Sequence, residues 1–316
     1  MLEKFKVNRI ENDGVIYFTY LGDDVQEEYE VSIVDPNTKL IVYKSMLGLK
    51  PNTEWWISTG SSNAKRLKNA HLKIKIGNKY HVQNIELNGE SRHLVVNSKE
   101  VTLKHNGDEL FPIVCEIFYD KIYERDYVRV QEGDVVVDIG ANYGVFSLYT
   151  QQFKPSKVFA MEPIKSTFKC LKSNLKSYGV TCINKAISNT DGFEKFGVTD
   201  VNGNNFSLKH SDGYHPSNVN TEEIVETITF NTLVESYGIE KIDYLKVDCE
   251  GGEMDLFNTI DSDFLQNNIN KIAIEYHSFL IKETLLGILT NNGFIIEDVV
   301  GRDEIGLIYA FNSKMR

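Results

Sequence analysis

The chain has few cysteines and few prolines, 4 and 6 among 316 residues. The four cysteines form no Cys-x-x-Cys pair and show no metal-ligand spacing, so they indicate neither a disulfide framework nor a zinc site. Reduced thiols are usual for proteins of a reducing compartment. We therefore expect four free thiols and a cytoplasmic location.

Long apolar runs are also missing. No stretch approaches the roughly 20 apolar residues that a membrane-spanning helix needs. No apolar run follows the opening Met-Leu-Glu-Lys-Phe-Lys, so we expect no signal peptide. Basic charge is scarce, because 34 Lys and Arg are outnumbered by 45 Asp and Glu, for a net charge of −11. Since nucleic acid binding requires a basic face, we predict neither a nucleic-acid partner nor a membrane span.

The residues up to about 107 consist of short β-branched and aromatic segments separated by turn-forming residues. The predicted strands are 15–20, 30–34, 39–43, 54–58, 72–76, 81–87, 94–97 and 101–104. Many short strands at this spacing are typical of a sandwich or a barrel. The prediction for residues 1–107 is therefore a β-rich accessory domain, all-β and sandwich or barrel-like.

From Glu109 the pattern changes to strands that alternate with helices. Apolar residues at helical spacing predict a helix over Phe111–Tyr127. The predicted strands are 135–138, 158–162, 181–185, 226–229, 244–248, 271–276, 293–299 and 307–311, with helices such as 166–178 and 252–259 between them. This alternation predicts a doubly wound α/β sheet over residues 108–316, and the last two strands, which no helix separates, predict an antiparallel hairpin.

The most informative stretch is 135–147, Val-Val-Val-Asp-Ile-Gly-Ala-Asn-Tyr-Gly-Val-Phe-Ser. A β-branched run ends at Asp138, and a turn from Gly140 to Gly144 leads directly into a helix-like segment. This pattern predicts a buried strand that enters a tight turn whose backbone N–H groups face a ligand. The next predicted strand ends in Glu162, and an acid about 20 residues after such a turn is placed to bind a ribose. Together the two strands predict a nucleoside site.

The turn also bears on which nucleoside is bound. A dinucleotide site needs Gly-x-Gly-x-x-Gly, whereas here Gly140 is followed by Gly144 without the middle glycine. An aspartate such as Asp138 just before the turn repels a pyrophosphate but attracts a sulfonium or an amino group. S-adenosylmethionine (SAM) carries both of these groups and a ribose. We therefore predict SAM, with NAD or FAD and a purely structural turn as the alternatives.

A second polar cluster lies at 244–253, Tyr-Leu-Lys-Val-Asp-Cys-Glu-Gly-Gly-Glu. Because side chains alternate along a strand, Lys246, Asp248 and Glu250 are expected on one face. Open α/β sheets bind ligands at the carboxyl ends of their strands. We therefore interpret the lysine and the two acids as a functional group, with a salt-bridged strand end as the alternative.

His277 follows the next predicted strand. It is either a general base near neutral pH or an ordinary loop histidine. Asp248, Glu250 and His277 could together hold a divalent cation. Since Asp-x-Glu spacing is weak evidence for a metal, we predict none.

The segment from about Glu116 to Phe311 resembles the FkbM-type SAM-dependent methyltransferases. The similarity runs in order through GDVVVDIGANYGVFSLY, VFAMEPIKSTFKCLKSNLK, INKAISNTDG, NNFSL, TFNTLVESYGIEKIDYLKVDCEGGE and IAIEYH. The ordered set is highly specific, although no single stretch would be. The resemblance implies a Rossmann-like class I methyltransferase domain. It also implies transfer of a methyl group to a hydroxyl, often on a sugar, glycolipid or polyketide.

The resemblance also implies individual roles. The residues that would surround the methionine part of SAM are Gly140, Ala141, Asn142 and Gly144. Glu162 would bind the ribose, and Ala186 and Ser188 would lie near the adenine. Lys246, Asp248 and Glu250 match the family's Lys-x-Asp-x-Glu-Gly segment beside the reacting centre. This chain has Thr232-Leu233-Val234 where the family usually has Thr-Leu-Asp.

These patterns together predict a SAM-dependent O-methyltransferase that acts on a sugar hydroxyl in a surface glycan or glycolipid. The base would be Asp248 or Glu250, with His277 as the next candidate and Lys246 beside them. Two alternatives stay open. One is a methyltransferase of a lipid, polyketide or small metabolite. The other is an inactive glycan-binding or assembly module.

Overall fold

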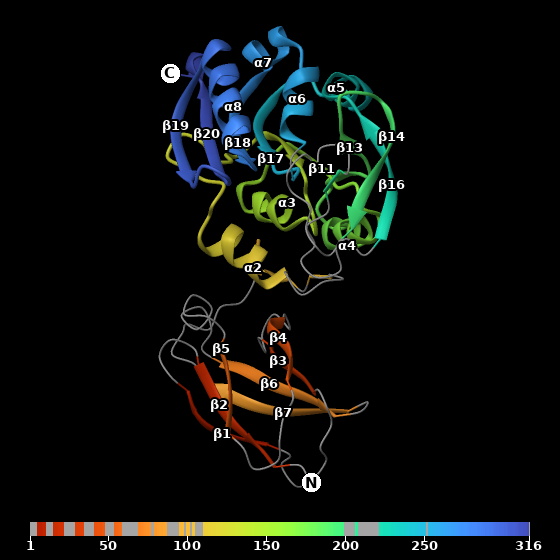
Figure 1. Cartoon of the computed structure of the whole chain (residues 1–316). Coiled ribbons are helices and arrows are strands. Elements are labelled where there is room, and N and C mark those ends of the chain that lie inside the picture. The colour runs from red at the N-terminus through yellow and green to blue at the C-terminus, as the bar shows by residue number, and fades with distance from the viewer. Residues whose placement is uncertain are drawn as a thin grey trace. The chain divides into compact units, whose positions relative to one another are not determined.

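The structure is a computed structural model of the chain. It describes residues 5–10, 15–21, 29–34, 41–47, 54–58, 69–76, 79–86, 95–97, 99–101, 103–104, 110–198, 206–207, 221–250 and 252–315. The chain divides into two compact units (Figure 1). The smaller unit is Met1–Thr102 with Asp108–Pro112, and the larger unit is Leu103–Gly107 with Ile113–Arg316.

The described part of the smaller unit consists mainly of strands. They are β1 (Phe5–Ile10), β2 (Val15–Tyr20), β3 (Tyr29–Val34), β4 (Ile41–Leu47), β5 (Glu54–Ser58), β6 (Asn69–Ile76), β7 (Lys79–Glu86), β8 (Val95–Val96) and β9 (Lys99–Glu100). They pair in the orders β1-β2-β5, β4-β3-β6-β7 and β8-β9. Ile16 and Phe18 are fully buried on one face of β2, which is the alternation expected of a strand with one face in a core. The described residues of the predicted strand 101–104 are not in a strand.

The larger unit contains a seven-stranded sheet in the order β12-β11-β10-β17-β18-β20-β19. Its strands are β10 (Val135–Ile139), β11 (Lys157–Met161), β12 (Thr181–Ile183), β17 (Ile242–Val247), β18 (Ile269–Tyr276), β19 (Phe294–Gly301) and β20 (Gly306–Asn312). β12, β11, β10, β17 and β18 pair in parallel, whereas β20 is antiparallel to both neighbours. This mostly parallel arrangement confirms the Rossmann-like prediction and the terminal hairpin.

Helices cover both faces of this sheet (Figure 1). They are α3 (Val145–Thr150), α4 (Lys165–Leu175), α5 (Phe230–Tyr237), α6 (Glu253–Thr259), α7 (Ser262–Asn268) and α8 (Phe279–Asn291), with 3-10 turns at Gln151–Phe153 and Ser313–Met315. Apolar residues of α5 to α8 join Val137, Ile139, Leu245 and Val247 in one core. The alternate residues of the central strands, such as Asp138 and Tyr244, face α3, where they contact Ser147 and Phe146. The period of two along β10 and β17 thus separates an apolar face from a face that carries the polar residues of the site.

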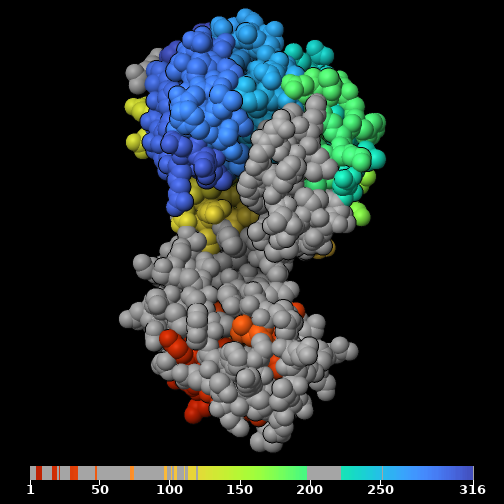
Figure 2. Space-filling model, viewed as in Figure 1, coloured from red at the N-terminus to blue at the C-terminus, as the bar shows by residue number. Residues whose placement is uncertain are grey.

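A separate four-stranded sheet was not predicted. It has the order β13-β16-β14-β15, and its strands are β13 (Ala186–Ile187), β14 (Gly192–Val198), β15 (Phe206–Ser207) and β16 (Thr221–Ile228). The predicted strand 226–229 therefore belongs to this sheet and not to the parallel one. Figure 2 shows β14 and β16 in green and teal at the surface, where Phe193 and Ile224 are 74% and 61% exposed.

The helix predicted over Phe111–Tyr127 is wrong beyond residue 119. An α-helix, α2 (Leu110–Val114), continues as a π-helix, η1 (Cys115–Tyr119), and the chain then becomes irregular. After the π-helix, the backbone carbonyls of Ile122 and Tyr123 accept hydrogen bonds from tyrosines of β20 and β17. All four cysteines are free thiols. Among the described residues, no helix is long and apolar enough to cross a membrane.

Candidate active site

The glycine turn lies at the carboxyl end of β10, in the middle of the parallel sheet. Gly140, Asn142 and Gly144 all have positive φ angles, +76°, +48° and +81°. The N–H groups of Gly140 and Ala141 donate to the Met161 carbonyl at the end of β11. The turn is thus tied to the neighbouring strand, and the chain enters α3 directly after Gly144.

Gly140 is required by the chain that passes beside it. A Cβ atom at this position would lie 1.6 Å from the Asp248 carbonyl oxygen at the end of β17. The Lys246 ammonium donates to the Gly140 carbonyl at 2.7 Å, and the Asp248 N–H donates to the Ile139 carbonyl. The first and second predicted clusters therefore form one site.

Glu162 follows β11 and is 6% exposed. Its carboxylate accepts from the Asn142 N–H at 3.1 Å and from the Ile164 N–H at 2.9 Å. Burial raises its pKa to about 7, although both backbone donors favour the charged form. Since each carboxylate oxygen has a second lone pair, Glu162 can orient the glycine turn and still accept hydroxyl groups of a ribose.

An unsatisfied oxygen in the turn tests whether SAM fits this site. Asn142 Oδ1 is buried and has no hydrogen-bond partner among the described residues. A buried amide oxygen without a donor costs about 1–3 kcal/mol. The ammonium group of SAM is such a donor, and the resemblance puts the methionine part of SAM at this residue. The oxygen, the glycines and Glu162 therefore fit the predicted cofactor.

Ala186 and Ser188 lie at the short strand β13, which belongs to the separate sheet. Ser188 is 1% exposed, its hydroxyl donates to Glu194, and its N–H donates to the Ile228 carbonyl. The two residues follow β12, whose last residue, Ile183, accepts from the Glu162 N–H. Their predicted place near the adenine stays a prediction. Val234, at the position where the family usually has an aspartate, packs in the apolar core.

Lys246 lies between two carboxylates on the α3 side of the sheet. Its ammonium is 3.4 Å from Asp138 Oδ1 and 3.3 Å from Asp248 Oδ2, and its side chain is 3% exposed. Burial disfavours the ammonium ion, but the charges of Asp248 and Asp138 outweigh burial and raise the pKa of Lys246. Asp138 is fully buried and also accepts from Ser147 at 2.7 Å. Lys246 thus pairs with Asp248 of the predicted group and with Asp138, and the functional role of the predicted group stays a prediction.

The pKa values of Asp138 and Asp248 are shifted in opposite directions. Burial raises the pKa of Asp138, because Lys246 and Ser147 only partly offset it. At Asp248 burial also raises the pKa, but Lys246, His277 and Tyr123 outweigh it and lower the pKa. Asp248 is therefore the more readily ionised of these two carboxyl groups.

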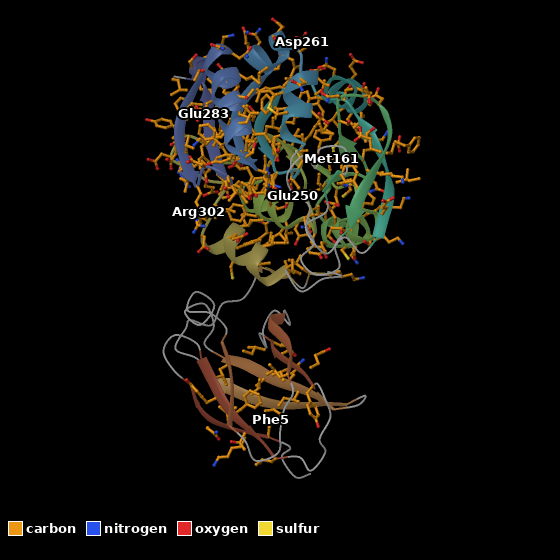
Figure 3. The ribbon with its side chains drawn as sticks, in the orientation of Figure 1. Phe5, Met161, Glu250, Asp261, Glu283 and Arg302 are labelled. Carbon is orange, nitrogen blue, oxygen red and sulfur yellow. The ribbon has the colours of Figure 1, made fainter. Side chains whose placement is uncertain are left out.

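Glu250 is the third acid of the cluster, and it has a positive φ of +50°. A non-glycine residue in the left-handed region costs free energy, and such residues concentrate at functional sites. Its side chain is 30% exposed, and Oε2 lies 3.4 Å from His277 Nε2. Burial and the charge of Asp248 raise the pKa of Glu250 to about 7. Figure 3 labels Glu250 and Met161, which mark the carboxyl ends of β17 and β11.

His277 is oriented by a buried glutamate. Its Nδ1 is 2.8 Å from Glu253 Oε1, and Glu253 is fully buried at the start of α6. Burial disfavours the imidazolium ion, but the hydrogen bond and charge of Glu253, with the charges of Glu250 and Asp248, outweigh burial. They raise the pKa of His277 to about 10. An imidazolium has no free lone pair on its ring nitrogens, so in this form His277 cannot accept a proton.

Two residues of the cluster were not predicted from the sequence. Glu275 is the last residue but one of β18, and burial together with the charge of Asp248 raises its pKa to about 8. The Tyr123 hydroxyl bonds to Asp248 and lies close to Glu275. Position at the end of a parallel strand could have indicated Glu275, but no local signal points to Tyr123.

The three residues considered for a cation do come together. Asp248, Glu250 and His277 each offer a ligand atom, and these atoms lie within 4.8 Å of one another. However, Lys246 already accompanies Asp248, and His277 lies close to both Glu250 and Glu253. Lys246 and the protonated His277 thus already place positive charge beside these acids. The absence of a metal stays a prediction.

The topology and the glycine turn define a protein that binds a nucleoside at the carboxyl edge of a Rossmann-like sheet. The sequence model described as "Methyltransferase FkbM domain" matches residues 138–296. The chain belongs to this family of methyltransferases, and its methyl donor is SAM. The family assignment confirms the resemblance inferred from the motifs.

Three curated relatives are each similar to about half of this chain. AMB antimetabolite synthetase AmbE of Pseudomonas aeruginosa is 28% identical over 54% of this chain and 10% of its own length. The 31-O-demethyl-FK506 methyltransferase FkbM of Streptomyces tacrolimicus is 29% identical over 46% of this chain and 54% of its own length. The hexuronic acid methyltransferase AglP of Haloferax volcanii is 28% identical over 49% of this chain and 63% of its own length. The matches thus span from a tenth to under two thirds of these three relatives.

Replacement of Glu162 by alanine is expected to weaken SAM binding by on the order of 2–3 kcal/mol, because hydrogen bonds to a charged acceptor are lost and the turn at Asn142 loses its anchor. Calorimetry with SAM measures this loss. Glu132→Ala is the matched control, because Glu132 is 77% exposed and makes only a 3.9 Å ion pair with Lys154. Wild-type affinity in Glu162→Ala would contradict the ribose assignment.

Proposed function

We propose that the chain is a SAM-dependent O-methyltransferase that acts on a hydroxyl of a sugar in a surface glycan or glycolipid. The observation that carries the proposal is Glu250. Its carboxyl group lies 3.4 Å from His277, on a strained backbone two residues after the Asp248 carbonyl that touches the glycine turn, and its pKa near 7 suits a general base at neutral pH. A hydroxyl acceptor needs such a base, because it must lose a proton as the new bond to carbon forms.

Bound SAM supplies an electrophilic methyl group. Glu250 would take the proton from the acceptor hydroxyl while the acceptor oxygen bonds to the methyl carbon and the bond from that carbon to the sulfur of SAM breaks, which leaves a neutral thioether. A carboxylate is a weak base for an alcohol, so the proton moves only when the hydroxyl has become acidic in the transition state. Lys246 keeps Asp248 ionised, and His277, held by Glu253, orients Glu250. The remaining catalytic contribution is alignment of the two reactants and exclusion of water.

The names of two relatives support the acceptor class. One acts on a demethylated hydroxyl position of FK506 by its name, and the other on a hexuronic acid. A sugar carries several hydroxyl groups, and only one of them is methylated. Several carboxylates at the site can accept hydrogen bonds from the other hydroxyls and so orient the sugar. Methylation of a lipid, polyketide or small metabolite is the alternative within the same chemistry.

The test is incubation of the protein with methyl-labelled SAM and fractionated cell glycans, followed by mass spectrometry of the labelled product. Label on a sugar oxygen would support the proposal. Label on a lipid or metabolite fraction would move the protein to the alternative acceptor class. SAM binding without transfer to any fraction would favour the inactive module.

The same reaction with EDTA should proceed at the same rate, because no metal is expected. Loss of activity on chelation and its recovery with magnesium would make Asp248, Glu250 and His277 metal ligands.

The domain division is part of the proposal. We infer that residues 1–107 form a β-rich accessory domain that orients the acceptor or mediates assembly, and that residues 108–316 form the transferase. Leu103–Gly107 groups with the larger unit, where the Lys104 backbone bonds to Asn174. A shortened chain that begins at Leu103 should therefore fold and bind SAM with nearly wild-type affinity. Loss of SAM binding in a well-folded shortened chain would contradict the division.

A further inference from the structure

Tyr123 precedes the residues that the family model matches, yet its hydroxyl reaches the centre of the site. The oxygen donates to Asp248 Oδ2 at 3.0 Å and lies 3.3 Å from Glu275 Oε2. The side chain is 5% exposed. A buried phenol thus joins two carboxylates at the carboxyl ends of neighbouring strands, β17 and β18.

The backbone at Tyr123 is held from two strands of the sheet. Tyr244 of β17 donates to the Tyr123 carbonyl, and Tyr309 of β20 donates to the Ile122 carbonyl. The Ile122 N–H donates to the Glu116 carbonyl in the π-helix, and Lys121 makes the intervening turn with a φ of +52°. These bonds fix the point from which the Tyr123 side chain enters the site.

The chain after Tyr123 is fastened to β19 and β20. We call residues 120–131 the strap; in Figure 1 it is part of the yellow trace that passes beside these strands. Arg125 pairs with Asp298 at 2.7 Å and lies 4.0 Å over the Tyr309 ring. The Glu297 carboxylate accepts from the N–H groups of Tyr127 and Val128. These contacts fix the conformation of the strap, as is expected of a segment that positions a side chain in a functional site.

The hydrogen-bonding capacity of the phenol decides how the cluster is arranged. A phenol has one hydrogen, so it donates fully to one carboxylate only. Asp248, beside the Lys246 ammonium, is that acceptor. Glu275 Oε2 lies 3.3 Å from the same phenol oxygen and is the more distant acceptor. The single hydrogen of Tyr123 is thus directed at Asp248 while Glu275 stays within its reach.

The ring of Tyr123 has packing contacts that do not involve its hydroxyl. The Lys246 ammonium lies 5.2 Å from the ring centroid, and the Phe146 ring meets it edge-on at 5.4 Å. Phenylalanine would keep both contacts. The role of the hydroxyl can therefore be separated from that of the ring.

We propose that Tyr123 is a positioning residue of the methyl-transfer site, whose hydroxyl fixes the Asp248 carboxylate and couples it to Glu275. The strap thereby becomes part of the site, although it lies outside the matched family domain. This inference rests on the proposed function, since Asp248 is expected beside the acceptor. A purely structural strap is the competing explanation, and it predicts a loss of stability without a specific loss of turnover.

The experiment compares Tyr123→Phe with Tyr149→Phe in the full-length protein. Tyr149 is a matched control, because its hydroxyl also anchors the strap, through Glu124 Oε1 at 2.8 Å, but touches none of the site carboxylates. Tyr123→Phe should lower kcat about 10-fold or more, while KM for SAM and its Kd by calorimetry change less than about twofold. Tyr149→Phe should lower the melting temperature and keep kcat.

Either of two activity results would overturn the proposal: wild-type kcat in Tyr123→Phe, or equal losses of kcat in both variants. A second measurement needs no acceptor. If the hydroxyl joins the carboxylates, the drops in melting temperature of Tyr123→Phe and Glu275→Gln should not add in the double variant, and additive drops would contradict the coupling. If the wild-type protein methylates no hydroxyl, the proposed function fails, while this comparison still decides whether the coupling exists.

Discussion

Replacement of Glu250 by glutamine is expected to lower turnover by about 10²-fold or more while SAM affinity changes little. Glutamine keeps the shape of the side chain, so its contact with His277 can survive, but an amide cannot accept the acceptor's proton. The loss should appear in kcat, because the missing interaction operates in the transition state. Calorimetry with SAM and steady-state kinetics with the labelled acceptor separate the two effects.

The pH dependence gives an independent check on the same residue. Glu250 acts as a base only when ionised, and its pKa is raised to about 7. Turnover of the wild-type protein should therefore rise as the pH increases through about 7 and then level off. Glu250→Gln should lose this rise, whereas Glu240→Gln, at an exposed loop position, should keep both the rise and the rate.

His277 provides the opposing outcome. If Glu250→Gln and Asp248→Asn keep nearly wild-type turnover while His277→Ala abolishes it, the base is the histidine. The geometry argues against this result, because Glu253 and Glu250 lie at opposite ring nitrogens and stabilise the imidazolium. The His277 imidazolium would first have to lose a proton, in the presence of three nearby acids, before the ring could act as a base.

The sequence predicted the central sheet well, because each strand carries a strong local signal. β10 is a run of three valines, an aspartate and an isoleucine, and β18 carries three isoleucines; the predicted bounds of both strands differ from the observed ones by at most two residues. The local sequence signal did not predict which sheet a strand joins, because that depends on the strand with which it pairs. β16 reads as an ordinary strand, but its place in the separate sheet depends on pairing with β14, which was not recognised.

The site was predicted in part for the same reason. Lys246, Asp248 and Glu250 are neighbours in sequence, so their proximity follows from strand geometry, whereas the positive φ of Glu250 does not. The contact between Tyr123 and Asp248 joins residues 125 positions apart. The apolar spacing after Phe111 indicated a continuous helix, but the backbone at Ile122 and Tyr123 bonds to tyrosines of β17 and β20. Tertiary contacts thus override the local helical pattern at the residue that reaches the site.

Replacement of Gly140 by alanine is expected to prevent folding, or to cost at least about 3–5 kcal/mol of unfolding free energy. Two penalties combine there. The φ of +76° is unfavourable for any residue with a Cβ atom, and that atom would lie 1.6 Å from the Asp248 carbonyl oxygen. Since this oxygen belongs to the backbone at the end of β17, relief of the clash would separate the glycine turn from the cluster of Lys246, Asp248 and Glu250.

Two other glycines separate these penalties in the same unit. Gly179 has a φ of +69° and open space around it, so Gly179→Ala should cost only about 1–2 kcal/mol, the backbone penalty alone. At Gly144 a Cβ atom would lie 2.9 Å from Leu175 Cδ1, a flexible side chain, so the loss should be intermediate. Denaturant unfolding of the three variants measures the series. If Gly140→Ala were no less stable than Gly179→Ala, the close contact between the turn and β17 would be wrong, and with it the geometry that joins the SAM site to Asp248 and Glu250.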